Sequence, residues 1–394
     1  MSKIWNKPLS PWPVFSEEEK SVVNKILTSG KVNYWTGDEG KHFEKEFAEF
    51  CHTKHAISLS NGTAALELAL VAIGIDRGDE VIGTPRTFMA SASCVVTRGA
   101  IPIFADVDFN SGNISAATIE PKITNKTKAI IVVHLAGFPC DMDSIMALAV
   151  KHDLFVIEDC AQAHGAMYNG KPVGSIGHFG AFSFCQDKIM STGGEGGMLI
   201  TNDENLWKKA WAYKDHGKSY DAVFNQEHPP GFRWLAESFG TNFRMTEMQA
   251  AIGRQQLKLL PEWTRKRQKN AQLLDDCISE YPALKLQYVP DGFQHARYKY
   301  YTYVVPSLLK EGWNRDRIQN AFWEEGIPCY VGSCSEVYNE MAFEKSGLKP
   351  LNPLPVAQEL GHISLMFLIH PTLTSEEMHA TCQAINKIME LASR

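Results

Sequence analysis

The chain has 394 residues, a length that suits one large domain and a smaller one. Its net charge of −6 offers no basic surface for a nucleic acid, and no apolar run reaches the ~18 residues needed to cross a bilayer. We therefore expect neither a nucleic acid nor a membrane among its partners. The first fifteen residues lack signal-peptide features, and the nine cysteines include no C-x-x-C pair, so we expect a cytoplasmic protein without a metal.

Residues up to about 205 alternate between helix and strand patterns. Ser16 and Glu19 form a capping box that opens a helix ending near Thr28, and a second helical segment covers 43–52. Continuously apolar strands are typical of a parallel sheet that is buried on both faces. The pattern predicts an α/β fold with strands at 55–60, 79–85, 101–107, 128–137, 154–159, 180–184 and 196–203, and helices at 63–74, 86–99 and 141–153.

The second half predicts a smaller α+β domain. The stretch 215–240 has no clear period, but its aromatic residues favour an ordered, functional loop. An amphipathic helix follows at 245–260, and we expect Pro261 to interrupt it before the pattern resumes to about residue 280. We place the large domain at 1–260 and the small domain at 261–394. The small domain has strands expected at 298–306 and 362–371 and helices at 315–326 and from Ser375 onward.

Lys188 and Asp159 together suggest a pyridoxal phosphate (PLP) site. PLP needs a lysine that forms a Schiff base and an acid that holds the pyridinium nitrogen. Asp159 ends an apolar strand, where ligands bind in open α/β sheets, and Lys188 lies between a strand and a glycine cluster. Gln162 is three residues further on, and one short helix could present both side chains to the cofactor. The alternatives are an exposed loop lysine and an aspartate that caps a helix starting at Ala161.

A phosphate site is expected where a strand turns into a helix at Gly62 and Thr63, because free N–H groups at a helix start bind anions. Ser183 could add a hydroxyl group to the same phosphate, and Phe88 could stack on the cofactor ring. The alternatives are a helix capped by Thr63 without a ligand, a strand serine bonded to backbone, and a core phenylalanine.

Three further segments of the sequence resemble ligand-binding motifs. Asn242 could direct its amide at a phosphate across a subunit interface, or it could cap a helix. Residues 165–172 match most of the sequence pattern of a nucleotide-binding loop, G-x-x-x-x-G-K. Pro172 stands where that pattern needs serine or threonine, so we expect a surface hairpin instead. The glycine cluster 193–197 does not fit a dinucleotide fingerprint.

With these residues, the chain resembles the DegT/DnrJ/EryC1/StrS family of PLP-dependent sugar aminotransferases, which have the aspartate aminotransferase (type I) fold. The resemblance runs over nearly the whole chain. Its blocks, in order, are NGTAAL (61–66), TFMAS (87–91), EDCAQAHGA (158–166), FSFCQDK (182–188), GGEGGMLITND (193–203) and TNFRMTEMQAA (241–251).

The resemblance implies a role for each matched residue. Lys188 would form the Schiff base, and Asp159 would pair with the pyridine nitrogen. Gln162 would approach the ring hydroxyl group, and Phe88 would stack on the ring. The remaining roles concern the phosphate: Thr63, Ala64 and Ser183 would hold it, and Asn242 would reach the phosphate of the neighbouring subunit's cofactor, which implies a homodimer with active sites at the interface.

The resemblance also implies an L-glutamate donor and a nucleotide-sugar acceptor. Residues 332–338 and 364–373 are similar to members that act on UDP-4-keto-6-deoxy sugars for surface glycans, which implies amination at C4. A sister branch carries histidine instead of lysine and removes a sugar hydroxyl group, so Lys188 favours transamination. A PLP-dependent dehydratase and a non-catalytic regulator that binds PLP or a sugar nucleotide remain as alternatives. Candidate sugar contacts are Trp35, His216 and Tyr330.

Overall fold

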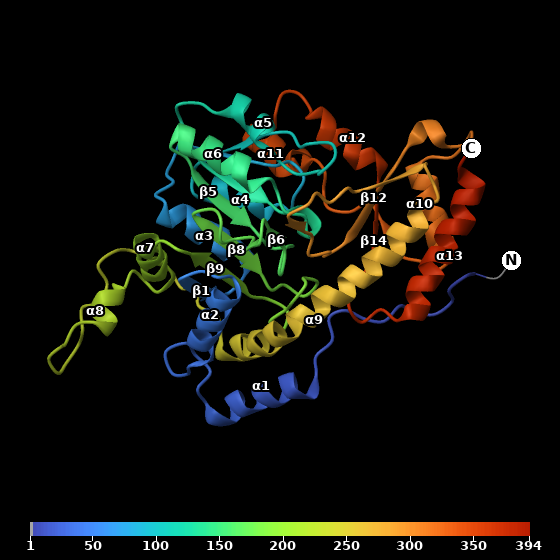
Figure 1. The fold of residues 1–394 in the computed structure, drawn as a ribbon. Coiled ribbons are helices and arrows are strands. Elements are labelled where there is room, and N and C mark those ends of the chain that lie inside the picture. The colour runs from blue at the N-terminus through green and yellow to red at the C-terminus, as the bar shows by residue number, and fades with distance from the viewer. Residues whose placement is uncertain (1–2) are drawn as a thin grey trace.

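A seven-stranded sheet forms the centre of the larger part of the computed structural model, which describes residues 3–394 (Figure 1). All neighbouring pairs are parallel except the two made by β9, so the mostly parallel sheet predicted from the sequence is confirmed. The strands, in spatial order, are β1 (His55–Leu59), β9 (Gly197–Thr201), β8 (Phe179–Ser183), β5 (Phe155–Asp159), β4 (Thr127–Val133), β2 (Glu80–Gly83) and β3 (Ile101–Phe104).

Helices cover both faces of this sheet because its strands are apolar on both sides. In β4, Ile130 and Val132 face one core, while Ile131 and Val133 face the other. The first core also contains residues of α2 (Glu39–Phe50), α5 (Ala116–Ile119), α6 (Met142–His152) and the start of α9. The second core contains residues of α3 (Gly62–Ala72), α4 (Ala90–Thr97) and α7 (Glu204–Lys214).

A smaller antiparallel sheet follows in the chain, and its strands β12 and β14 lie within the two segments predicted as strands. Tyr300 packs in a third core, on the outer face of this sheet. Tyr301 and Tyr303 face a fourth core, which also contains Phe104 of the large sheet. The strands, in spatial order, are β10 (Leu284–Leu286), β12 (Tyr300–Val304), β14 (Ser364–Phe367) and β13 (Cys329–Tyr330). The helices of this part are α10 (Arg315–Glu324), α11 (Met341–Ser346), α12 (Pro355–Ile363) and α13 (Ser375–Ala392).

One helix, α9 (Glu247–Ile278), joins the two parts without a break, so the predicted interruption at Pro261 is wrong. A proline removes one helical hydrogen bond, but Leu260 and Trp263 are buried on either side of Pro261 and keep the flanking turns in place. The boundary placed at 260/261 falls inside this helix, and the division into two domains stays a prediction. Met1 and Ser2 of the predicted large domain lie outside the described residues.

The remaining elements lie around the edges. Helix α1 (Glu17–Ser29) begins with the predicted capping box and runs alongside α9. The predicted hairpin is β6 (Met167–Tyr168) with β7 (Lys171–Pro172), and β11 (Phe293–Gln294) extends it. Among residues 3–394, no helix combines the length and apolar character needed to span a membrane.

The stretch 215–240 contains one short helix, α8 (Tyr220–Phe224), and a loop that projects from the body of the molecule (Figure 1). Phe232 and Trp234 pack against each other there, yet 78% and 87% of their surfaces are exposed. Two aromatic residues of this loop therefore contact each other while staying largely exposed, and the ordered, functional loop stays a prediction.

Candidate active site

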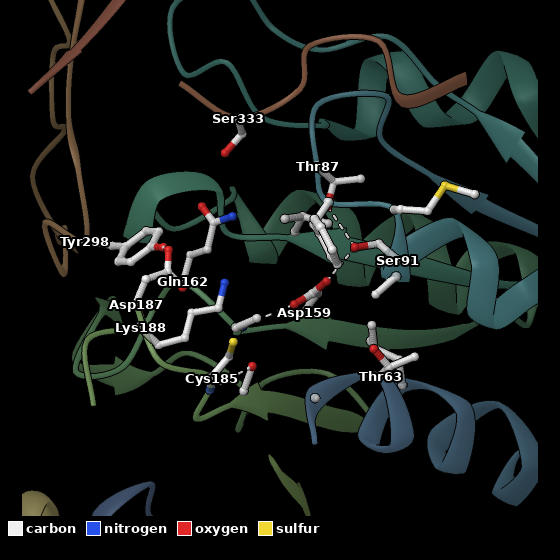
Figure 2. A pocket seen from close by; sticks show the side chains of 18 of the residues that line it. Thr63, Thr87, Ser91, Asp159, Gln162, Cys185, Asp187, Lys188, Tyr298 and Ser333 are labelled. Carbon is white, nitrogen blue, oxygen red and sulfur yellow. Dashed lines mark hydrogen bonds between the residues drawn. The ribbon is translucent and has the colours of Figure 1, made fainter. Parts of the chain in front are cut away.

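A pocket of about 940 Å³ opens at the carboxyl ends of β4, β5 and β8 (Figure 2). Asp159 and Ser183 line it where their strands end, and the start of α3 closes one side. Residues of the small sheet, including Tyr301 and Tyr330, line the opposite wall. Ligands bind at this edge of parallel sheets because strand ends and helix starts meet there.

Asp159 is 5% exposed, and its carboxylate is fixed by two donors. The Ser91 hydroxyl group donates to Oδ2 at 2.7 Å, and the backbone N–H of Ala161 donates to Oδ1 at 3.1 Å. Because the only hydroxyl proton of Ser91 is used in this way, Thr87 donates to Ser91 at 2.7 Å. No helix begins at Ala161; residues 161–165 form turns, so Asp159 caps a turn rather than a helix.

Lys188 lies in the loop between β8 and β9, half-buried, and its amine points into the space between Gln162 and Asp159 (Figure 2). Its Nζ lies 5.3 Å from the centroid of the Tyr298 ring. The Tyr298 hydroxyl group donates to Asp187, and Trp12 Nε1 donates to the Lys188 carbonyl oxygen at 2.8 Å. Trp12 therefore holds the lysine backbone and Tyr298 holds the neighbouring Asp187 side chain, while the lysine amine faces the pocket.

Gln162 lines the same pocket, from a turn rather than from the short helix that was expected. Its Oε1 accepts the backbone N–H of Ala136 at 2.7 Å, so the amide oxygen is engaged. The NH₂ group of the same amide is left to donate into the pocket.

The opposite end of the pocket lies at the start of α3. Asn61, not Thr63, is the N-cap: its side chain accepts the backbone N–H of Ala64 at 2.8 Å. The cap engages the Ala64 N–H group, whereas the first N–H groups of a helix, here those of Gly62 and Thr63, have no partner inside the helix. This end of the pocket therefore suits an anion.

Gly62 packs directly against Ser183 at the end of β8. A Cβ atom on Gly62 would lie 2.6 Å from the Ser183 Cβ, a separation that side chains do not tolerate. The glycine therefore brings the helix start next to the serine, which lines the same pocket. An anion cradle, a fixed carboxylate and a free amine are the groups that PLP requires, so the residues present fit this cofactor.

Of the other residues predicted to contact the cofactor or the sugar, some line the pocket and some do not. Phe88 and Tyr330 line the pocket, and 69% of the Phe88 surface is exposed. Trp35, His216 and Asn242 do not line it in the single chain. Trp35 Nε1 instead donates to the buried Asp215 at 3.0 Å, His216 is exposed, and Asn242 is exposed beside the same Asp215 segment.

Several residues of the site were not found from the sequence. Thr87 and Ser91 are four residues apart, a spacing that could have suggested one helix face. Tyr298 and Lys299 gave no comparable signal, because only the three-dimensional fold brings them to Lys188.

One group of residues could in principle ligate a metal: His134, Glu158 and Cys160, all buried within residues 3–394. Glu158 accepts the His134 Nε2–H at 2.9 Å and backbone N–H groups of the loop after β7, and His134 Nδ1 accepts a backbone N–H at 3.0 Å. Burial raises the pKa of the Cys160 thiol well above its usual value, so the sulfur keeps its proton. The carboxylate and imidazole are thus already engaged in hydrogen bonds that hold the sheet to its loops.

Residues 13–386 match the sequence model of the DegT/DnrJ/EryC1/StrS aminotransferase family. GDP-perosamine synthase of Escherichia coli O157:H7 is 35% identical over 95% of this chain and 96% of that protein. The X-ray structure of an aminotransferase from Psychrobacter cryohalolentis is 57% identical, with a TM-score of 0.95, and the match covers 97% of this chain and 99% of that one. Spr1654 of Streptococcus pneumoniae, solved in a PLP form, is 26% identical, with a TM-score of 0.86 and coverage of 98% and 99%. The chain therefore belongs to the DegT/DnrJ/EryC1/StrS aminotransferase family and is a PLP-dependent sugar aminotransferase.

Proposed function

We propose that this enzyme transfers the amino group of L-glutamate to C4 of a UDP-4-keto-6-deoxy sugar, in the biosynthesis of amino sugars for surface glycans. The observation that carries the proposal is the shared pocket of Lys188 and Asp159, with the start of α3 at its opposite end. L-Glutamate would leave as 2-oxoglutarate, and the sugar ketone would become an amine.

PLP, when bound, supplies an electron sink that stabilises negative charge at the substrate carbon. Asp159 would hold the protonated pyridine nitrogen, and Gln162 would contact the ring through its free NH₂ group. Gly62, Thr63 and Ser183 would hold the phosphate. Lys188 would hold the cofactor through its aldehyde, and its amine is the base that would move a proton at the substrate carbon.

The choice of nucleotide rests on the small-domain wall. Gly332, Ser333 and Cys334 line the pocket, as do Met366 and Leu368. They belong to the segments 332–338 and 364–373, whose resemblance to enzymes of UDP-linked sugars supports a UDP substrate. The similar E. coli protein is named for a GDP sugar, so a GDP-linked sugar is the alternative substrate.

We also propose a homodimer of the type I fold with its active sites at the subunit interface. Phe88 lines the pocket but is largely exposed, which supports a second subunit that covers it. Asn242 is exposed outside the pocket, where it could reach the cofactor of that second subunit. Sedimentation velocity of the PLP-loaded protein is expected to give a dimer. A fully active monomer would contradict this part of the proposal.

The direct test is product analysis with L-glutamate and a panel of UDP-, GDP- and dTDP-linked 4-keto-6-deoxy sugars. We expect a 4-amino sugar and one equivalent of 2-oxoglutarate, fastest with the UDP sugar. Faster turnover of the GDP sugar would move the substrate assignment to that nucleotide. A deoxy sugar without a new amine would show dehydration and refute the proposed reaction.

A further inference from the structure

Lys299 is a second lysine in the pocket wall, immediately before β12. Among the residues that line the pocket, Lys188 and Lys299 are the two cations. The amine of Lys188 is required for the cofactor aldehyde, so Lys299 is the cation that remains for a substrate. The substrates of a sugar aminotransferase are anions, which makes this remaining charge relevant to binding.

The ammonium group of Lys299 shares an aromatic neighbour with the reacting amine. Its Nζ is 4.8 Å from the centroid of the Tyr298 ring, and the Nζ of Lys188 is 5.3 Å from the same centroid. Across residues 3–394, Lys299 forms only this contact with an aromatic ring and has no salt bridge; the nearby Asp187 accepts a hydrogen bond from Tyr298 instead. The charge is therefore left without a protein anion as its direct partner.

The ammonium group of Lys299 is also largely withdrawn from solvent. Burial lowers its pKa to about 8, Asp187 opposes this shift, and Arg267 and Lys188 add to it. Arg267 is fully buried, and burial lowers its pKa to about 9. A cation that is desolvated in this way gains more from an anionic ligand than an exposed lysine would.

We propose that Lys299 binds the α-carboxylate of the amino-acid donor. The α-carboxylate is bonded directly to the carbon that loses its proton, so it must lie close to the Lys188 amine, and Lys299 lines the same pocket beside the same tyrosine ring. The phosphates of a nucleotide sugar are separated from C4 by the sugar ring and would lie further away. This assignment rests on the proposed function, in which an amino acid is the donor, and gives Lys299 a role in only one of the two half-reactions.

The test compares the two half-reactions in Lys299→Met, which removes the charge and keeps the apolar stem. For the PLP form, the L-glutamate concentration giving half-maximal rate is expected to rise about tenfold or more, as expected for the loss of one charge-assisted hydrogen bond. For the pyridoxamine form, the reaction with the keto sugar is expected to change less than twofold. Lys299→Arg should retain most of the donor affinity.

A matched control is Lys285→Met, on the neighbouring strand β10, where the lysine donates to Asn110 at 3.0 Å and does not line the pocket. It is expected to leave both half-reactions unchanged. If Lys299→Met slows both half-reactions equally, or leaves the L-glutamate dependence within twofold of the wild type, Lys299 does not bind the donor.

Titration with glutarate, an unreactive dicarboxylate, gives a readout that requires no turnover. The wild-type PLP form is expected to bind glutarate at least tenfold more tightly than Lys299→Met. If L-glutamate, L-aspartate and L-alanine all fail to convert the wild type, the proposed function fails. Glutarate then decides the role of Lys299 alone, because equal binding by the two proteins overturns it.

Discussion

At the scale of single residues, the site depends on contacts between segments that are far apart in the sequence. Ser91 is 68 residues from the Asp159 carboxylate that it bonds, and Tyr298 is 111 residues from Asp187. The candidate roles of Asp159 and Lys188 could be predicted because each follows an apolar strand and belongs to a recognisable block. The contact of Tyr298 with Asp187 could not be predicted, since only the fold brings the two together. Ser91 lies in the block 87–91, but the block does not show that its hydroxyl group bonds Asp159.

Gly62 gives a prediction at this scale. We expect Gly62→Ala to lower PLP affinity by at least tenfold, because the new Cβ would meet Ser183 Cβ at 2.6 Å and separate the helix start from β8. The measurement is the dissociation constant for PLP, obtained by titrating the apo protein.

Gly83→Ala is the matched control, since a Cβ at Gly83 would meet nothing within 4 Å. This variant should bind PLP as the wild type does. If the two variants bind PLP equally well, the close approach of α3 to Ser183 does not shape the phosphate site.

At the scale of elements, strands were predicted better than helix ends. The strands of the large sheet are buried on both faces, which leaves a continuous apolar run in the sequence. The helix expected at 86–99 begins only at Ala90, and α7 was not predicted. Helix ends depend on caps and tertiary contacts, which are difficult to predict from a single sequence.

Pro261 gives a prediction at the scale of one helix. It lies inside the 32-residue helix α9, with its side chain on the exposed surface. We expect Pro261→Ala to raise the free energy of unfolding by about 1–3 kcal/mol, because alanine restores the missing N–H donor and removes a steric conflict. Thermal unfolding of the apo protein measures this as a higher Tm.

Pro355→Ala provides the comparison, since Pro355 is the first residue of α12, where proline fits a helix. No stabilisation is expected there. A Tm for Pro261→Ala that is equal to or below that of the wild type would show that α9 is bent or packed to suit its proline.

At the scale of the whole molecule, the active site is built by both parts of the chain. The large sheet supplies Lys188, Asp159 and the start of α3, and the small sheet supplies the opposite wall with Lys299 and Tyr330. The sequence predicted strands and helices in both parts of the chain, but it could not show which residues around the smaller sheet face the cofactor end. That placement depends on how α9 and the shared core around Phe104 set the two sheets against each other.

The projecting stretch 215–240 is also a property of the whole molecule. Phe239 is fully exposed there, together with Phe232 and Trp234. The sequence of this stretch has no helix or strand period, because most of the stretch is neither helix nor strand. Trp35 packs at its base, with its ring stacked 6.2 Å from that of Phe224, and its expected contact with the sugar stays a prediction.

The central claim is that Lys188 holds the cofactor through its amine. The visible absorption spectrum of the purified protein, with PLP and then with L-glutamate, tests it most directly in the wild type and in Lys188→Ala. We predict that the wild type gains a visible band that L-glutamate bleaches, and that the band of the covalently held cofactor is absent from Lys188→Ala. The same lysine-linked band in Lys188→Ala, or no visible band in the wild type, would contradict the account.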